Sequence, residues 1–463
     1  MIRKLGNYFS EGFKKNMPNS FVFALILTLV TALAALIWVD ASFIEMADSW
    51  YQGFWLLLEF GMQMALILIT GYSIALSNTA KKAMNFLARQ LKTPALVYIF
   101  VILIGYLLAL VSWGWLVITA VLGRELAMRV KGINYYYLIA CVYFSGGIWV
   151  CGLSSSIPLL LNTPGNFLIE GGILSQTLPT SFTLGSGLNL AVAAVYVLVG
   201  PLLFYLLAPK EVVDLPDLLE VKSNTEASIE EEAAAARLPE PALSDKLNNG
   251  WFFQYVIAGL GLFYIGYYFW TRGLDLNLNI MIFIFLILGL FLHKTPMRYG
   301  IAMKHASSNI SGILFQYPFY AAIMGIMIYT GLGEKLASLM ASVATMDSYP
   351  FFAYLTGGLV NFAIPSAGGE FAVIGHSVLT AIKEIGAGLP VEQLDLMMAK
   401  ASLAVAYGET LTNLLQPFFL LIVLPVMGKG IKVQARDVMG YLIIPFIVIF
   451  TAIGLVVSLV QVS

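Results

Sequence analysis

Residues 94–123 hold two apolar runs separated by a short break: PALVYIFVILIGYLLALV (94–111), SWG (112–114) and WLVITAVLG (115–123). A helix rises about 1.5 Å per residue, so the first run reaches deep into a bilayer whose hydrocarbon core is about 30 Å thick. A break leaves backbone groups unpaired at that depth, which is tolerated only where it faces protein or a cavity. We therefore predict a re-entrant hairpin over about 94–128, with its tip near Trp113 and Gly114.

The whole chain shares this apolar character. Of its 463 residues, 59% are hydrophobic and 11% are charged, and the mean hydropathy is +0.85. A soluble domain carries about 25% charged residues, so the composition predicts a polytopic membrane protein and excludes a nucleic-acid binder. The sequence shows no nucleophile–base pair and no metal-ligand spacing. We therefore expect neither an enzyme nor a resident cofactor.

The apolar segments recur in two halves at an offset of 255 residues. Segment 21–39 corresponds to 276–294, and 188–208 corresponds to 443–463. One further apolar segment, 251–270, lies between the halves, and this odd crossing inverts the second half relative to the first. Inverted repeats with broken helices are typical of secondary transporters. We predict an all-α membrane protein with two inverted-topology repeats, each with a re-entrant hairpin and a broken transmembrane helix, and about nine spans.

The predicted organisation has four parts: a first membrane repeat at 18–208, a cytoplasmic linker at 209–250, a connecting transmembrane helix at 251–271 and a second membrane repeat at 275–463. The linker is rich in Glu, Ala and Pro. It could be a docking element, although a solvated tether is the simpler interpretation. Placing the N-terminus in the cytoplasm and the C-terminus in the periplasm puts 21 of the 25 Lys and Arg residues inside, as the positive-inside rule requires.

A second break is predicted in each half, at 152–156 continuing to 162–166, and at 407–410 continuing through Asn413 to Gln416 and Pro417. Glu409 lies in the latter, and a carboxylate at the bilayer centre costs about 2.5–3.5 kcal/mol on insertion scales. We predict that Glu409 couples transport to a cation; capping of a half-helix is the alternative. Glu370, at the tip of a second hairpin over about 350–385, is the other candidate ion-coupling residue.

Hydroxyl, amide and glycine groups gather at these breaks in both halves. Half-helix N-termini suit an anionic group there, and freed carbonyls suit a cation. Lys and Arg are scarce at this depth, so a bound anion should carry little charge; the flanking aromatic residues suit a short alkyl chain. The candidate substrate-binding residues are Trp113, Ser154, Ser155, Ser156, Asn162, Thr163, Ser366, Gly368, Gly369, Thr410 and Asn413.

Several motifs carry a resemblance to a known family: FWLLLEFGMQMAL (54–66), LIAC (138–141), PLL (158–160) with TPGN (163–166), HKTPM (293–297), NFAIPS (361–366), and AYGE (406–409) with QPF (416–418). Together they resemble the bacterial short-chain fatty acid transporter family, which is associated with acetoacetate and butyrate uptake. The resemblance covers nearly the whole chain. It implies an inner-membrane secondary transporter of the ion-transporter superfamily, with paired re-entrant hairpins, a homodimeric assembly and elevator-like motion.

The leading hypothesis is symport of a short monocarboxylate with a cation, in the lipid bilayer of the inner membrane. The coupling ion is H⁺ or Na⁺, and the sequence does not choose between them. Transport of another small anion or of an amino-acid-like substrate is the alternative. An anion channel is a different class of protein, which inverted repeats with central breaks disfavour.

Overall fold

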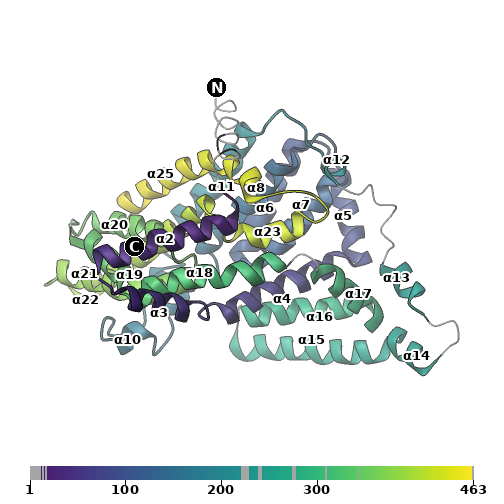
Figure 1. Cartoon of the computed structure of the whole chain (residues 1–463), viewed down its shortest axis with the longest axis horizontal. Coiled ribbons are helices and arrows are strands. Elements are labelled where there is room, and N and C mark those ends of the chain that lie inside the picture. The colour runs from purple at the N-terminus through teal and green to yellow at the C-terminus, as the bar shows by residue number, and fades with distance from the viewer. Residues whose placement is uncertain are drawn as a thin grey trace.

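The computed structural model describes residues 12, 15, 18–219, 229–237, 242–273, 278–307, 310–342 and 344–460. Across these residues the chain is helical, with no strand and a single isolated bridge between Asn134 and Val213. The prediction of an all-α protein is therefore confirmed. Figure 1 shows the helices as one elongated bundle, with α13 and α14 at one end.

The first half contains α2 (Ser20–Trp38), α3 (Phe43–Gly53), α4 (Leu58–Ala75), α5 (Asn78–Gln90), α6 (Pro94–Val111), η1 (Trp113–Trp115), α7 (Leu116–Ala127), α8 (Tyr135–Ser145), η2 (Gly146–Cys151), α9 (Ser156–Leu161), α10 (Phe167–Glu170), η3 (Thr180–Phe182) and α11 (Gly187–Leu207). The middle of the chain contains α12 (Leu215–Leu218), α13 (Ile229–Ala235), α14 (Leu243–Asn249) and α15 (Phe252–Arg272).

The second half contains α16 (Leu278–His293), α17 (Pro296–Ser307), α18 (Ser311–Tyr329), α19 (Leu332–Ser342), α20 (Tyr349–Val360), α21 (Ala367–Ile385), α22 (Val391–Thr412), η4 (Asn413–Leu415), α23 (Leu420–Met427), α24 (Ala435–Met439), η5 (Gly440–Leu442) and α25 (Ile443–Leu459). The helix starts follow the spacing seen in the sequence: α20 begins 255 residues after α6, and α22 and α25 begin 256 residues after α8 and α11.

Six helical stretches among the described residues are long and apolar enough to cross a membrane: Ser20–Trp38, Pro94–Val111, Tyr135–Leu161, Gly187–Leu207, Leu243–Arg272 and Ala435–Leu459. A seventh is the pair Val391–Leu415 and Leu420–Met427, which is bent by 45°. Three shorter apolar helices lie at Gly61–Ile74, Asn279–His293 and Leu314–Tyr329. These stretches confirm a multi-pass membrane protein, whereas the count of nine spans stays a prediction.

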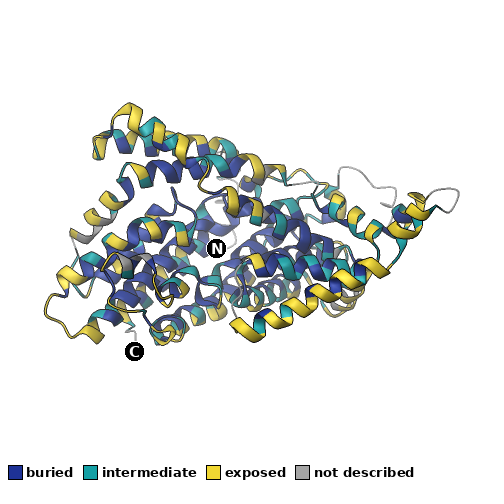
Figure 2. Ribbon diagram, turned by 90° about the horizontal axis from the view of Figure 1, so that it is seen from below, coloured by how far each residue is buried: buried dark blue, intermediate teal, exposed yellow. Residues whose placement is uncertain are grey.

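The core is densest where α20 packs against α22. Gly408 lies so close to the backbone of Tyr354 that an added Cβ would overlap the Tyr354 carbonyl oxygen, and Gly357 meets the backbone of Val405 in the same way. Small residues allow membrane helices to approach to this distance. Every residue of α22 from Met398 to Thr412 is buried. Figure 2 shows buried residues gathered in the interior and exposed ones along the outer helices.

This packing corrects the predicted break at 407–410. Helix α22 runs unbroken through Gly408 and Glu409 and ends at Thr412, so the break lies at 413–419, before α23 begins. Gly408 interrupts the apolar pattern because it makes room for α20, and it leaves the helix intact. The predicted breaks at 112–114 and 152–156 do separate helices in the structure, where α6 ends at Val111 and α9 begins at Ser156.

The described parts of the linker are docked on the membrane helices. The Asp214 carboxylate accepts hydrogen bonds from the N–H groups of Gly132 at 2.8 Å and Ile133 at 3.0 Å. Farther along, the Ile229 side chain is buried, and the Glu232 carboxylate lies 2.9 Å from the His305 ring. These contacts tie the described parts of the linker to the rest of the chain, and its role as a docking element or as a tether stays a prediction.

Candidate functional site

Glu409 is fully buried near the C-terminal end of α22. Its carboxylate accepts a hydrogen bond from the Thr410 hydroxyl at 2.9 Å and one from the Asn413 amide at 3.2 Å. Both donors are neutral, and no Lys, Arg or His of the described chain is hydrogen-bonded or ion-paired to it. Because burial removes the water that would stabilise the charge, an uncompensated carboxylate here is costly.

An amide cluster holds Asn413 in one orientation. The Asn413 side-chain oxygen accepts hydrogen bonds from the amides of Asn361 and Gln416, each at 3.0 Å. Its nitrogen must therefore face Glu409, since the oxygen is already occupied by donors. Asn361 also donates to the Thr412 hydroxyl at 2.9 Å, and Gln416 donates to the Asn361 carbonyl at 2.9 Å. The cluster thus links the end of α20 to the break after α22 and presents a donor to the carboxylate.

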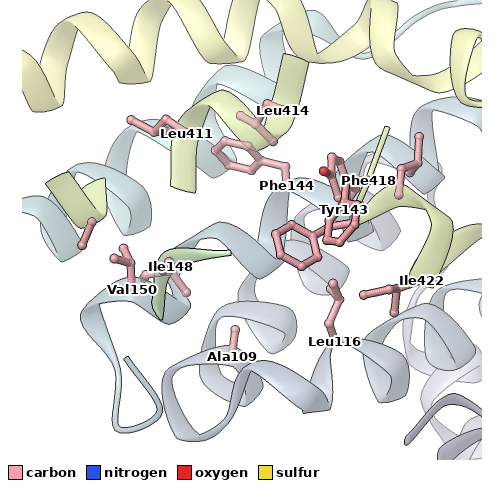
Figure 3. Close-up of a cluster of buried hydrophobic side chains, with 14 of the residues drawn as sticks. Ala109, Leu116, Tyr143, Phe144, Ile148, Val150, Leu411, Leu414, Phe418 and Ile422 are labelled. Atoms are coloured by element: carbon pink, nitrogen blue, oxygen red, sulfur yellow. The ribbon is translucent and has the colours of Figure 1, made fainter. Parts of the chain in front are cut away.

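A cavity of about 30 Å³ lies beside this cluster. It is lined by the first hairpin tip, the α8–η2 region and the end of α22: Trp113, Leu116, Tyr143, Gly146, Gly147, Trp149, Thr410, Asn413, Leu414 and Phe419. Figure 3 shows Leu116, Tyr143 and Phe418 close together among the buried apolar side chains of this region.

The first hairpin tip is tied to the break of its own half. The backbone N–H of Trp113 donates to the Ser154 hydroxyl at 2.8 Å, and the N–H of Leu153 donates to the Leu110 carbonyl at 2.8 Å. Gly152 packs directly on the Leu110 backbone, where a Cβ would collide. Ser154 therefore holds the tip that carries Trp113 to the cavity.

The second tip, between α20 and α21, approaches the same break from the other half. Ser366 caps α21 by accepting a hydrogen bond from the Gly369 N–H at 3.4 Å. Gly368 faces Ser156 closely, since a Cβ on Gly368 would lie 3.8 Å from the Ser156 hydroxyl oxygen. Glu370 follows on the same turn and is fully buried, with no hydrogen-bond partner for either carboxylate oxygen.

The predicted site residues fall into three groups. Trp113, Glu409, Thr410 and Asn413 meet at the cavity and its amide cluster. Glu370 with Ser155, Ser156, Ser366, Gly368 and Gly369 gathers where α21 begins and packs on α9. Asn162 and Thr163 are exposed, and neither lines the cavity.

Sequence reasoning missed most of the cavity lining, including Tyr143, Gly146 and Gly147. Tyr143 donates from its hydroxyl to the Asn413 carbonyl at 2.7 Å, and Gly146 and Gly147 line the cavity. The pair of adjacent glycines in an apolar run was the available signal, because glycines allow close approach in membrane helices. A tyrosine in such a run carries no comparable signal.

A larger cavity of about 450 Å³ lies near the start of α22. Its lining includes Asp347, Gln393 and Lys400, and the lysine is 3% exposed. Lys400 precedes Glu409 by nine residues on one helix, which corresponds to about 13.5 Å along the axis. Helix α22 therefore connects the cavity lined by Lys400 to the buried carboxylate of Glu409.

The model of the family described as "Short chain fatty acid transporter" matches residues 1–462 of this chain. The chain belongs to that family. A Haemophilus influenzae protein named "Putative short-chain fatty acid transporter" is 34% identical over 450 residues, which cover 95% of this chain and 96% of that protein. An Escherichia coli protein of the same name is 35% identical over 448 residues, covering 96% of each chain. The sequence resemblance is therefore confirmed.

Two solved structures are similar at lower identity. The YdaH transporter of Alcanivorax borkumensis has a TM-score of 0.40 and 16% identity, covering 95% of this chain and 98% of that one. MtrF of Neisseria gonorrhoeae has a TM-score of 0.33 and 13% identity, covering 96% of each chain. Membership of the short-chain fatty acid transporter family identifies the chain as a transporter.

Proposed function

We propose that the protein takes up short-chain fatty acids or related small monocarboxylates by symport with a cation, H⁺ or Na⁺. The observation that carries this proposal is the Glu409 carboxylate, which is buried beside a cavity shared by both halves and is bonded only by neutral donors. Such a carboxylate can hold a proton or complete a sodium site. The family and the names of its members supply the substrate class.

Uptake of a monocarboxylate requires a cation on energetic grounds. The inside-negative membrane potential opposes entry of one negative charge by ~2.3 kcal/mol per 100 mV. The cavity lining contains no Lys, Arg or His among the described residues, so the protein itself does not balance the anion there. A cation that travels with the substrate would supply the missing charge.

The size of the Glu409 cavity supports alternating access. At about 30 Å³ it is far smaller than the pockets of about 300–1,000 Å³ that hold small molecules. Substrate binding there therefore requires movement of the surrounding tips and breaks. We propose that this movement is elevator-like, between two inverted repeats with re-entrant hairpins and nine spans. We further propose a homodimer in the bacterial inner membrane, with the N-terminus in the cytoplasm.

The larger cavity is a suitable vestibule for the anion. Its volume of about 450 Å³ lies in the range of small-molecule pockets, and its lining carries the positive charge of Lys400 beside the negative charge of Asp347. The distribution of basic residues predicts that Lys400 lies on the periplasmic side. We propose that substrate first meets the protein at this cavity before it reaches Glu409.

Uptake of labelled butyrate into proteoliposomes tests the function directly. With an imposed Na⁺ or pH gradient, we expect saturable accumulation above the external concentration. Saturable accumulation separates a transporter from a channel, which can only equilibrate its substrate. Absence of accumulation under both gradients would show that the proposed function is wrong.

A further inference from the structure

We propose that Glu370 is a second cation-binding carboxylate, so that two monovalent cations enter with each monocarboxylate and uptake is electrogenic. This inference rests on the proposed symport and adds its stoichiometry. The site is the Glu370 carboxylate on the first turn of α21, a helix that packs on α9.

Glu370 is the least satisfied carboxylate of the described chain. It is fully buried, and neither oxygen has a hydrogen-bond partner. Its own backbone N–H is occupied, since it donates to the Ser366 carbonyl at 2.6 Å. A buried polar side chain normally has at least one partner, so an unpartnered carboxylate indicates that a ligand belongs there.

The segment that packs on α21 also carries unpartnered oxygen atoms. The hydroxyl oxygens of Ser155 and Ser156 are also buried without hydrogen-bond partners. Ser156 lies against Gly368 on the tip that carries Glu370, and α9 packs on α21. Carboxylate and hydroxyl oxygens are ligands for hard cations, and a carboxylate alone can also take a proton. No cysteine or histidine takes part in this group.

Glu370 and Glu409 form a pair of like charges. Both carboxylates are fully buried, and the helices that carry them, α21 and α22, pack against each other. Neither carboxylate has a Lys, Arg or His hydrogen-bonded or ion-paired to it in the described chain. Two negative charges, plus the negative charge of the substrate, would repel one another in a region from which water is excluded. One cation would leave two of these three negative charges uncompensated while the substrate crosses, whereas two cations would leave only one.

The charge balance gives a measurable consequence. Two cations and one monocarboxylate move one net positive charge inwards per cycle. An inside-negative potential then drives uptake, and 100 mV raises the accumulation ratio about 50-fold. Symport with a single cation moves no net charge, and the potential has no effect on its accumulation ratio.

The experiment measures butyrate accumulation in proteoliposomes at 0 and 100 mV, with the potential set by potassium and valinomycin. Na⁺ and pH gradients are imposed separately at zero potential to identify the cation. For the unmodified protein we expect the potential to raise accumulation about 50-fold. In E370Q, we expect uptake to remain driven by the cation gradient and to lose its response to potential.

Two controls accompany E370Q. E59Q changes an exposed carboxylate that accepts a hydrogen bond from Gln63, and its response to potential should equal that of the unmodified protein. Exchange of labelled for unlabelled butyrate needs binding and conformational change but no net charge movement. Exchange by E370Q would therefore show that the variant is folded.

The outcomes separate this inference from the function on which it rests. Accumulation by the unmodified protein that ignores potential overturns the two-cation stoichiometry and leaves symport intact. Absence of accumulation under every gradient overturns the symport itself. A full response to potential in E370Q overturns the assignment of Glu370, and the measurement on the unmodified protein decides the stoichiometry even if E370Q does not fold.

Discussion

The hydroxyl of Tyr143 donates a hydrogen bond of 2.7 Å to the backbone carbonyl of Asn413, 270 residues away in the chain. Tyr143 lies on α8 in the first half, and Asn413 begins the break after α22 in the second. Both residues line the small cavity. This bond therefore joins the two halves at the position where the Glu409 carboxylate meets its amide donor.

Replacing Tyr143 with Phe should destabilise the protein without leaving a large cavity in its core. The ring stays, but the Asn413 carbonyl keeps only the longer bond of 3.3 Å from the Gln416 N–H, and the lost hydrogen bond should cost about 0.5–1.5 kcal/mol. We expect a lower midpoint of thermal unfolding in detergent. Tyr264→Phe, on the exposed face of α15, is the matched control and should leave the midpoint unchanged. Equal midpoints for both variants would mean that the Tyr143 hydroxyl contributes nothing.

Glu409→Gln should remove ion coupling while leaving folding and membrane insertion intact. The amide can still accept hydrogen bonds, but it carries no charge and binds no proton at neutral pH. We expect gradient-driven butyrate uptake to be abolished. If Glu409 merely caps a helix end, transport should fall only modestly. Near-normal accumulation with unchanged ion dependence would contradict the coupling role.

Gly408→Ala should weaken the packing of α20 on α22. The added methyl group would collide with the Tyr354 carbonyl, and overpacking typically costs about 1–3 kcal/mol. Unfolding in detergent should therefore begin at a lower temperature. Gly259→Ala in α15 has open space around it and should be neutral or slightly stabilising. Equal unfolding temperatures for Gly408→Ala and Gly259→Ala would show that the close contact between α20 and α22 does not contribute to stability.

Lys400→Gln should weaken capture of the anionic substrate. A positive charge in a cleft raises the local concentration of anions, and its loss should raise KM about 10-fold. The number of cations per substrate should not change, because Lys400 lies far from Glu409 along α22. Lys335→Gln alters an exposed lysine and serves as the control. A normal KM in Lys400→Gln would exclude the vestibule role.

The sequence was a good guide to the helices and an incomplete guide to the site. Helices α6, α20, α22 and α25 were predictable because each coincides with an apolar run that is visible in the local sequence. Glu409 was predictable because a carboxylate stands out in an apolar run. Gly408 was misinterpreted as part of a break, since a glycine can mark a break or a close contact, and only the partner helix decides which.

Other features depend on contacts that have no local signature. Tyr143 resembles the many buried tyrosines until its partner in the other half is known. The orientation of Asn413 depends on the amide of Asn361, which is 52 residues away in the chain, as well as on that of the nearby Gln416. The lack of a partner for Glu370 is likewise a property of the folded chain.

The backbone contact between α20 and α22 also guides the choice of spectroscopic probes. Where Gly357 and Gly408 leave no room for side chains, the two helices must move together as one piece. Spin labels at the outer ends of this pair should give the same distance distribution with and without butyrate, and so provide an internal ruler. Labels placed on α8 and α22, on either side of the Tyr143 bond, are the pair expected to report motion.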